Sequence, residues 1–269
     1  NWAQWMWRLV FMGIGAFVVV FILLSFTNLP SVSQLENPKS ELASVAYGST
    51  GAELGRFYIE NRVPVDYEDL SPHLVNALIA TEDERYYRHC GIDFEALGRV
   101  AVKTVLLRQK SAGGASTITQ QLAKLLFTGE KAGGWGRVFQ KLREWIIAVR
   151  LERRYTKEEI LAMYLNKFNF INGAYGIKAA SEIYFDRSQD SLEIQEAAVL
   201  VGMLKNPSLF NPLRRPESVV QRRNVVLRQM YRNGLLRKDE FDSLKSLPLG
   251  LRFTRQTHID GVAPYFRME

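Results

Sequence analysis

The sequence predicts a mainly α-helical protein with one small β element near its start. Beyond residue 70, apolar residues return at intervals of three and four, the spacing that places them on one face of a helix. Two of these segments begin at helix-start patterns, Ser71-Pro72 and Thr156-Lys157-Glu158-Glu159. Residues 42–66 instead alternate short apolar and aromatic runs around the glycines at 48 and 51, which predicts a β-hairpin.

Residues 9–29 are predicted to form a transmembrane helix that follows a cytoplasmic stub at residues 1–8. The first 18 of these residues carry no charge, and at about 1.5 Å per residue they cover roughly 27 Å of a bilayer. A cleaved signal peptide is the alternative, but its apolar region is usually only ~7 to 15 residues long. Because Arg8 is the only charge before Pro30, the N-terminus is expected in the cytoplasm and the rest of the chain outside.

The charge balance favours partners that carry negative charge. The 269 residues hold 35 Lys and Arg against 28 Asp and Glu, and all of these except Arg8 lie beyond the predicted anchor. Such an excess near a bilayer suits anionic head groups or a phosphate-bearing substrate, and it is also typical of a merely solvated surface. No nucleic-acid partner is expected. With one cysteine, and three histidines outside zinc-ligand spacing, neither an internal disulfide nor a zinc site is predicted.

The first helix of the main domain is predicted to carry a candidate acid or base. It starts at Ser71-Pro72, and Val75, Ile79 and Glu82 share one side of it. Apolar neighbours favour the protonated form of a carboxylate and so raise its pKa. Catalytic carboxylates often have such a raised pKa. The alternative is a structural helix end in which Glu82 or Asp83 pairs with Arg85 or Arg88.

A flexible glycine-containing break then leads into a hydroxyl-rich helix start. A second amphipathic helix is predicted at residues 93–107, and Thr117 with Gln120 forms a capping-box pattern just after the break. Free N–H groups and the helix dipole make such a start suitable for an anion, and Gln121 and Lys124 project together from the same helix. An ordinary capped helix is the alternative.

The next helix, residues 138–154, places a second carboxylate among cations. Glu144 sits beside the apolar stripe, and Arg137, Lys141 and Arg143 surround it as a set suited to a diphosphate. Four further features complete the predicted order: a helix from Thr156 through Leu165, a turn at 172–176, and apolar helices at 192–204 and 216–232.

From residue 47 to residue 266 the chain resembles the glycosyltransferase domain of class A penicillin-binding proteins and the monofunctional peptidoglycan glycosyltransferases. The resemblance rests on ordered motifs, namely Glu82-Asp83 with Tyr86, His89 and Gly91; Gly114-Ala115-Ser116-Thr117-Ile118-Thr119-Gln120-Gln121 with Lys124; Lys141-Leu142-Arg143-Glu144; Lys157-Glu158-Glu159-Ile160-Leu161 leading to Asn166; and Arg223-Asn224-Val225-Val226-Leu227. Three positions depart from the pattern. Tyr86 replaces a phenylalanine, Gln140 replaces an arginine whose charge Arg137, Lys141 or Arg143 would supply, and Asp186 stands in a predicted surface turn where glycine is common.

The resemblance implies a lysozyme-like fold of two lobes and the polymerisation of lipid II into β-1,4-linked glycan by inverting transfer. Glu82 is then the general base, and Glu144 acts on the diphosphate side, where it is also a candidate ligand for Mg²⁺ or Mn²⁺. The implied substrate-binding residues are Asp83, His89, Ser116, Thr117, Gln120, Gln121, Lys124, Arg137, Lys141, Arg143 and Asn166. Lipid II, the growing glycan strand, membrane lipids and other cell-wall synthesis proteins are the implied partners, and moenomycin is the family's inhibitor.

The implied location is the bacterial inner (cytoplasmic) membrane, with a single pass and the catalytic domain on the periplasmic side. The linker and hairpin would occupy residues 30–70, the glycosyltransferase domain residues 71–250, and the start of a linker to a transpeptidase domain residues 251–269. No Ser-x-x-Lys or Lys-Thr-Gly motif of a transpeptidase occurs in the sequence, so we expect a truncated bifunctional enzyme.

Two other functions compete with the transferase. A membrane-anchored, lysozyme-like glycan hydrolase or lytic enzyme could use the same pair of carboxylates, but it would not need Ser116, Thr117, Gln121 and Lys124. A non-catalytic binding module would need neither Glu82 nor Glu144.

Overall fold

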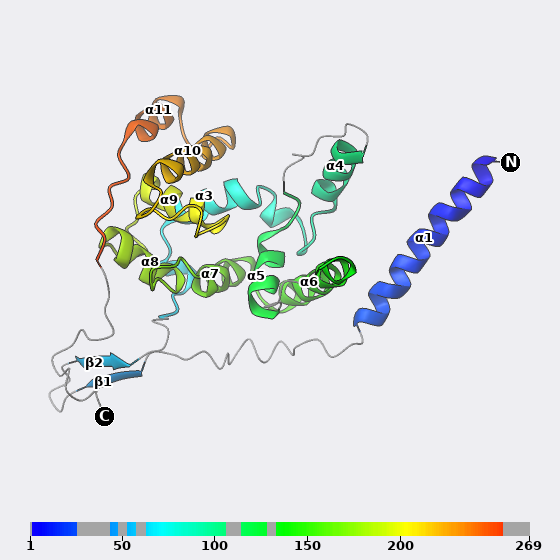
Figure 1. Ribbon diagram of the computed structural model, residues 1–269, viewed down its shortest axis with the longest axis horizontal. Coiled ribbons are helices and arrows are strands. Elements are labelled where there is room, and N and C mark those ends of the chain that lie inside the picture. Colours follow the sequence, from blue (N-terminus) through cyan, green and yellow to red (C-terminus); the bar gives the residue numbers. More distant parts are fainter. Residues whose placement is uncertain are drawn as a thin grey trace. The chain divides into compact units, whose positions relative to one another are not determined.

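The structure is a computed structural model that describes residues 2–25, 44–47, 53–57, 63–105, 114–127 and 133–254 (Figure 1). It is mainly helical, as the sequence predicts. The chain divides into two compact units. The first unit consists of residues 1–38 and 89–155, and the second of residues 39–88 and 156–269.

The first unit contains four helices among the described residues: α1 (Trp2–Ser25), α4 (Phe94–Val105), α5 (Ile118–Phe127) and α6 (Trp135–Arg154). α5 packs against α6, and both contribute fully or almost fully buried apolar side chains. These are Ile118, Leu122, Ala123, Leu142, Ile146, Ile147, Ala148 and Leu151. α4 begins where the Asp93 carboxylate accepts a hydrogen bond of 2.9 Å from the Ala96 N–H, the geometry of an N-cap.

The predicted membrane anchor falls mostly on α1. This helix already begins at Trp2, within the predicted cytoplasmic stub, and it runs to Ser25, while residues 26–29 lie outside the described residues. Within the part of the chain that the structure describes, no helix has both the length and the apolar character that crossing a bilayer requires.

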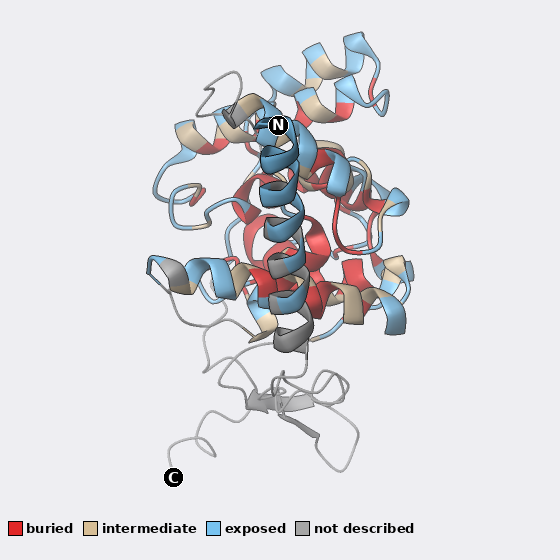
Figure 2. Cartoon of the chain, turned by 90° about the vertical axis from the view of Figure 1, so that its right-hand side faces the viewer, coloured by how far each residue is buried: buried red, intermediate tan, exposed pale blue. Residues whose placement is uncertain are grey.

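The second unit is built around α9 (Ile194–Leu204), in which every residue from Glu196 to Leu204 is buried. A helix that is apolar on all sides belongs in a core, and α3 (Pro72–Glu82), α10 (Pro216–Arg232) and α11 (Lys238–Ser246) pack against it. Buried positions, red in Figure 2, accordingly gather on the inner faces of the helices and exposed positions on the outer faces. The unit also contains η1 (Tyr67–Asp69), η2 (Tyr86–Arg88), α7 (Lys157–Lys167) and α8 (Gly176–Phe185).

Two short strands precede the helices of the second unit. β1 (Ser44–Tyr47) pairs with β2 (Glu53–Phe57) in antiparallel register, with an irregularity between Ala46 and Tyr47. The turn predicted between them, at residues 48–51, lies outside the described residues.

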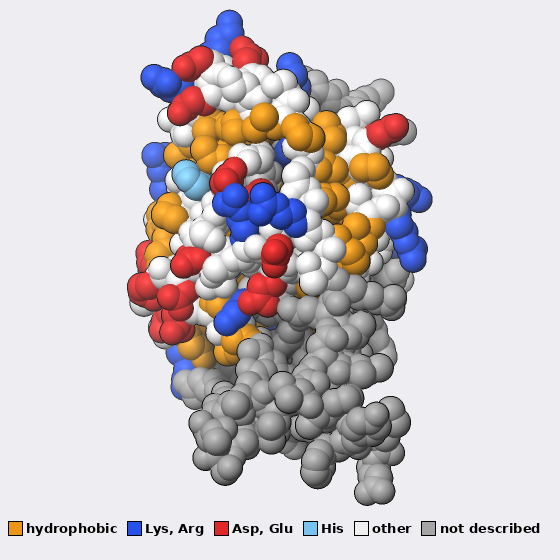
Figure 3. Space-filling view, turned by 90° about the vertical axis from the view of Figure 1, so that its left-hand side faces the viewer, with side chains coloured by type: hydrophobic (Ala, Val, Ile, Leu, Met, Phe, Trp, Pro, Cys, Tyr) orange, Lys and Arg blue, Asp and Glu red, His pale blue; other side chains and the backbone are white. Residues whose placement is uncertain are grey.

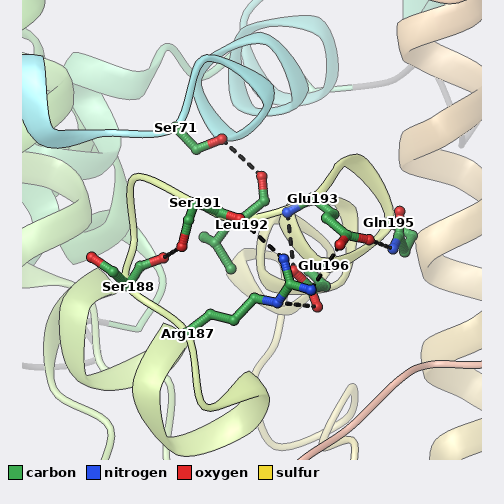
Figure 4. A network of polar contacts seen from close by, with 8 residues as sticks. All are labelled: Ser71, Arg187, Ser188, Ser191, Leu192, Glu193, Gln195 and Glu196. Carbon is green, nitrogen blue, oxygen red and sulfur yellow. Dashed lines mark hydrogen bonds and ion pairs between the residues drawn. The ribbon is translucent and has the colours of Figure 1, made fainter.

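The predicted helix starts are found, but not all of their caps. Thr156 and Glu159 form a complete capping box, since the hydroxyl accepts from the Glu159 N–H and the carboxylate accepts from the Thr156 N–H. Ser71 is the N-cap residue of α3, as predicted, and Pro72 is its first residue. The Ser71 hydroxyl, however, makes no cap hydrogen bond and instead donates to the Leu192 carbonyl at 3.0 Å (Figure 4). That hydroxyl therefore ties α3 to the segment before α9.

The turn after α8 explains the departure at Asp186. Asp186 is exposed and adopts left-handed backbone angles, φ 50° and ψ 45°, as the C-cap of α8. Glycine adopts these angles without strain, which accounts for its frequency at this position of the family pattern. The following Arg187 pairs with Glu193 at 2.8 Å and with Glu196 at 3.5 Å, and thereby links the turn to the start of α9 (Figure 4).

A fully buried arginine closes the C-terminal end of the second unit. Arg223 of α10 donates to the carbonyls of Lys245, Leu247 and Pro248 at 2.9, 2.7 and 3.0 Å. It also donates twice, at 3.1 Å, to the amide oxygen of Asn224. The guanidinium thus satisfies carbonyls at the end of α11 that the helix itself leaves without partners.

On the face drawn in Figure 3, acidic and basic side chains are interspersed, and hydrophobic side chains lie between them. The net charge of +7 therefore does not produce a uniformly basic surface on this face.

Candidate active site

The predicted site residues fall into two groups, one in each compact unit. His89 and the residues from Ser116 to Glu144 belong to the first unit, whereas Glu82, Asp83 and Asn166 belong to the second. The contacts within each group show which side chains bond to other parts of the protein and which have exposed polar atoms.

In the first unit, the Gly91 carbonyl organises the start of α5. It accepts a hydrogen bond of 2.7 Å from the Thr117 hydroxyl and one of 3.1 Å from the Gln120 amide. Gly91 itself has φ +87°, and a Cβ there would lie 3.0 Å from the backbone of Ala148 in α6. The glycine of the motif is therefore needed both for its backbone angle and for the close approach of α6. His89 belongs to the same turn, because its Nδ1 accepts from the Gly91 N–H at 3.2 Å.

These contacts correct the predicted capping box. The Thr117 hydroxyl does accept from the Gln120 N–H at 3.1 Å, but the Gln120 side chain turns to Gly91 instead of returning to the cap. Its amide oxygen is buried without a hydrogen-bond partner. Thr117 and Gln120 are both almost fully buried, so their observed contacts are structural.

Ser116, Lys141 and Glu144 form a cluster, which we call the lysine cluster. The Lys141 ammonium lies 3.0 Å from the Ser116 hydroxyl and 3.0 Å from Glu144 Oε2. The Glu144 side chain is 7% exposed, while that of Lys141 is 38% exposed, so the cation faces solvent in front of a buried carboxylate. Lys141, one of the predicted cations, thus contacts Glu144 directly. It is a candidate to supply the positive charge that an arginine at position 140 would carry.

The other predicted cations and amides of the first unit are more exposed. Lys124, Arg137 and Arg143 have exposed side chains, and that of Gln121 is half-buried. Lys124 and Gln121 lie on α5 one turn apart, and the two arginines lie on the first three turns of α6. Their exposed positions are open to a large anionic ligand.

In the second unit, Glu82 is the last residue of α3 and is largely buried. Arg222 of α10 faces it, with 3.5 Å between Nη2 and Glu82 Oε1. Tyr164 of α7 is fully buried nearby, and its pKa is raised, mainly by burial and further by the charge of Glu82. Sequence reasoning did not identify Arg222, although it lies three residues after Val219 and four before Val226, on the buried stripe of α10.

Two further residues of this group make contacts that stabilise the fold. The Asn166 amide accepts from the Val65 N–H at 3.1 Å and donates to the Val65 carbonyl at 2.8 Å, so both of its ends are occupied by backbone. Asp83 is buried, and its carbonyl accepts from the N–H of Tyr86 at 3.0 Å.

The hydroxyl that distinguishes Tyr86 from phenylalanine has a partner. It donates to the Lys157 carbonyl at 2.8 Å, and the Lys157 ammonium lies 4.4 Å from the centre of the Tyr86 ring. The substitution thus adds a contact between the segment after α3 and the first turn of α7.

The described residues do not fit a divalent cation held by the protein. Among them, no group of three or more His, Cys, Asp or Glu side chains is arranged to hold a metal ion. Glu144, the predicted ligand, is instead paired with the Lys141 ammonium. A protein-held metal site normally assembles several oxygen or nitrogen ligands, and the described residues do not bring such a set together.

The chain is similar to known proteins over most of its length. A family model described as Transglycosylase matches residues 50–231. Penicillin-binding protein 1A of Escherichia coli (strain K12) is 36% identical over 238 residues, which cover 88% of this chain and 27% of that protein. Penicillin-binding protein 1F of Bacillus subtilis (strain 168) is 39% identical over 208 residues, which cover 77% of this chain and 28% of that protein.

A solved structure gives a further comparison. The crystal structure of penicillin-binding protein 1A from Haemophilus influenzae matches with a TM-score of 0.44 and 22% identity, over 80% of this chain and 22% of that one. The chain therefore spans less than a third of the length of each of these three relatives. Because the family model covers more than half of the sequence, and two relatives exceed 30% identity over most of it, the chain belongs to the transglycosylase family, whose domain it shares with class A penicillin-binding proteins.

Proposed function

We propose that this chain is a peptidoglycan glycosyltransferase that polymerises lipid II. The observation that carries the proposal is the lysine cluster, in which one ammonium group contacts both a hydroxyl and a buried carboxylate. Such an arrangement suits the departure of a diphosphate, because a fixed cation stabilises negative charge where it develops. A glycan hydrolase has an uncharged sugar hydroxyl as its leaving group and does not need this cation.

On the leaving-group side, Lys141 is the central residue of the proposal. Its ammonium is partly exposed and can approach phosphate oxygens, while Glu144 holds it in place from the buried side. Lys124 and Ser116 are assigned to the same diphosphate, since one is an exposed cation and the other a hydroxyl just before the N-terminus of α5.

On the acceptor side, Glu82 is proposed as the general base. It takes the proton of the acceptor 4-hydroxyl as that oxygen forms a bond to the anomeric carbon of the donor. The bond from this carbon to the diphosphate breaks in the same displacement, so an α-linked donor gives a β-linked product. General-base catalysis of this kind typically contributes about 10² to 10⁴ in rate.

The proposal includes a membrane location, because the donor and the growing strand both carry an undecaprenyl chain. A lipid tail of that length confines the substrate to a bilayer, so polymerisation has to occur at its surface. The location follows here from the proposed substrate alone.

The test is to incubate the purified chain with fluorescent lipid II in liposomes and to separate the products by gel electrophoresis. New glycan longer than the starting disaccharide is expected. Shortening of added glycan without new polymer would instead indicate the hydrolase and overturn the proposal.

Variants then separate the proposed roles. Lys141→Ala should reduce the rate by about 10² to 10³, the usual cost of one stabilising donor. It should also weaken moenomycin binding, whereas Glu82→Gln should abolish polymerisation with moenomycin binding nearly intact. Arg153→Ala, an exposed arginine on the same helix as Lys141, is the matched control and should change neither readout.

A further inference from the structure

Arg222 lies beside the proposed general base and has no role in the reaction as described above. Glu82 ends α3 and Arg222 lies in α10, so the packing of these two helices creates the pair. Their side chains are only 16% and 12% exposed, and Nη2 is 3.5 Å from Oε1. We propose that Arg222 is a positioning residue, which holds the Glu82 carboxylate in one orientation. The inference rests on the proposed function and extends it to a residue outside the motifs.

The guanidinium of Arg222 is fixed by contacts other than Glu82. Its Nε donates to the Gly202 carbonyl of α9 at 3.4 Å, and its Cζ lies 5.8 Å from the centre of the Phe210 ring. A planar guanidinium held by an aromatic ring and a carbonyl has little freedom to rotate. Its other N–H groups can therefore hold the Glu82 carboxylate in one orientation. Arg222 does this without contacting the substrate itself.

Gly202 provides independent support, because it sits in the middle of the buried helix α9. A glycine inside a helix is less favourable than alanine, because its backbone loses more freedom on folding. A Cβ at this position would lie 3.1 Å from Cγ of Arg222, which is closer than an ordinary contact. The glycine thus leaves room for the arginine to pass along α9 toward Glu82.

The charges are consistent with the same role. Burial lowers the pKa of Arg222, and the negative charge of Glu82 opposes this effect. The titratable groups shown to face Glu82 from neighbouring helices are Arg222 and, from α7, Tyr164. Because the pKa of Tyr164 is raised, this phenol stays neutral at working pH and contributes no charge. Arg222 therefore places a positive charge beside the Glu82 carboxylate, and the low exposure of both side chains strengthens their attraction.

The adjacent Arg223 shows what a structural arginine looks like in the same helix. All of its hydrogen bonds go to backbone carbonyls and to the Asn224 amide, and none goes to a carboxylate. Arg222 instead contacts the residue assigned as the base. Two neighbouring arginines thus have separable tasks, and this predicts different responses to substitution.

The experiment compares Arg222→Gln, Arg222→Lys and the control Arg228→Gln, an exposed arginine of the same helix, in the full chain. Initial rates of lipid II polymerisation are measured against substrate concentration and across roughly pH 3.5 to 9, a range that extends below the ordinary glutamate pKa of about 4.3. Arg222→Gln should lower kcat by about 10- to 100-fold, the scale of a misplaced catalytic group. The KM for lipid II should change by less than about twofold, because Arg222 is not assigned to substrate binding.

The pH profile gives the readout that a purely structural role would not change. Removing a cation beside a carboxylate favours the protonated form, so the acidic limb of the kcat profile of Arg222→Gln should move to higher pH. Arg222→Lys should restore part of kcat and most of the pH profile, since it returns the charge but not the planar fork. Arg228→Gln should match the unaltered chain throughout.

A second variant covers the case in which Arg222→Gln does not fold. Gly202→Ala keeps every charged group but pushes the Arg222 side chain away from α9, so kcat should fall while the melting temperature does not. If the unaltered chain makes no polymer, the proposed function is wrong. If it does make polymer, and folded Arg222→Gln or Gly202→Ala retains its full kcat and pH profile, then the proposed function stands and the inference about Arg222 is wrong.

Discussion

Replacing Arg223 with alanine should be among the most damaging single changes in the second unit. The substitution removes five hydrogen bonds from a fully buried guanidinium, three of them to the carbonyls of Lys245, Leu247 and Pro248. Hydrogen bonds to charged groups contribute about 1.5 to 3 kcal/mol each, although water can reach some carbonyls at the exposed end of α11 once the arginine is gone. Breaking a buried charged network usually costs about 3 to 5 kcal/mol, and this is the expected loss in free energy of unfolding.

The assay is chemical and thermal unfolding followed by circular dichroism. At about 2 to 4 °C per kcal/mol for a chain of this size, the melting temperature should fall by roughly 10 °C. Arg223→Lys should be intermediate, because an ammonium cannot reproduce the planar arrangement of donors. Arg228→Ala, on the exposed side of the same helix, should stay within about 0.5 kcal/mol of the unaltered chain. A loss below about 1 kcal/mol in Arg223→Ala would show that these carbonyls do not depend on the arginine, and would refute the reasoning.

Three further changes test other parts of the structure. Asp186→Gly should raise the free energy of unfolding by about 0.5 to 1 kcal/mol, because glycine adopts the left-handed angles without strain; an unchanged or lower melting temperature would contradict this. Gly91→Ala should destabilise the first unit by about 1 to 3 kcal/mol, since its Cβ would approach the Ala148 backbone to 3.0 Å, and a stable variant in thermal melts would count against the close approach. The pKa of Glu193 is lowered, chiefly by its hydrogen bond from Gln195, so the stability that Glu193 contributes is present above its ordinary pKa and is lost as the pH falls. Glu193→Gln should therefore flatten the acidic part of the curve of unfolding free energy against pH. A variant curve identical to that of the unaltered chain would exclude the effect.

The parts of the fold that could be predicted are those encoded locally. The capping box at Thr156 involves residues three apart, and the apolar run of α9 is recognisable without knowing what packs on it. α8 and α11 were not predicted as helices. α8 starts at Gly176 without a side-chain cap, and α11 buries none of its residues, so neither produces a strong signal in the sequence.

The same distinction holds for the candidate site. Lys141 and Glu144 lie one turn apart on a helix, so their pairing was readable from their spacing. The contacts of Gln120 with Gly91, of Asn166 with Val65 and of Glu82 with Arg222 join residues far apart in the chain. Such contacts depend on how helices pack, which a single sequence does not specify, and this is why Arg222 was missed.

Gly202 has a consequence for anyone who seeks a more heat-resistant version of this domain. Replacing a glycine inside a helix with alanine is a routine way to raise melting temperature, and a buried glycine in α9 would rank high among the candidates. Here the added methyl group would meet the Arg222 side chain. The alanine variant therefore has to be judged by polymer synthesis as well as by melting temperature. Libraries that vary position 202 should therefore be sorted by turnover as well as by stability.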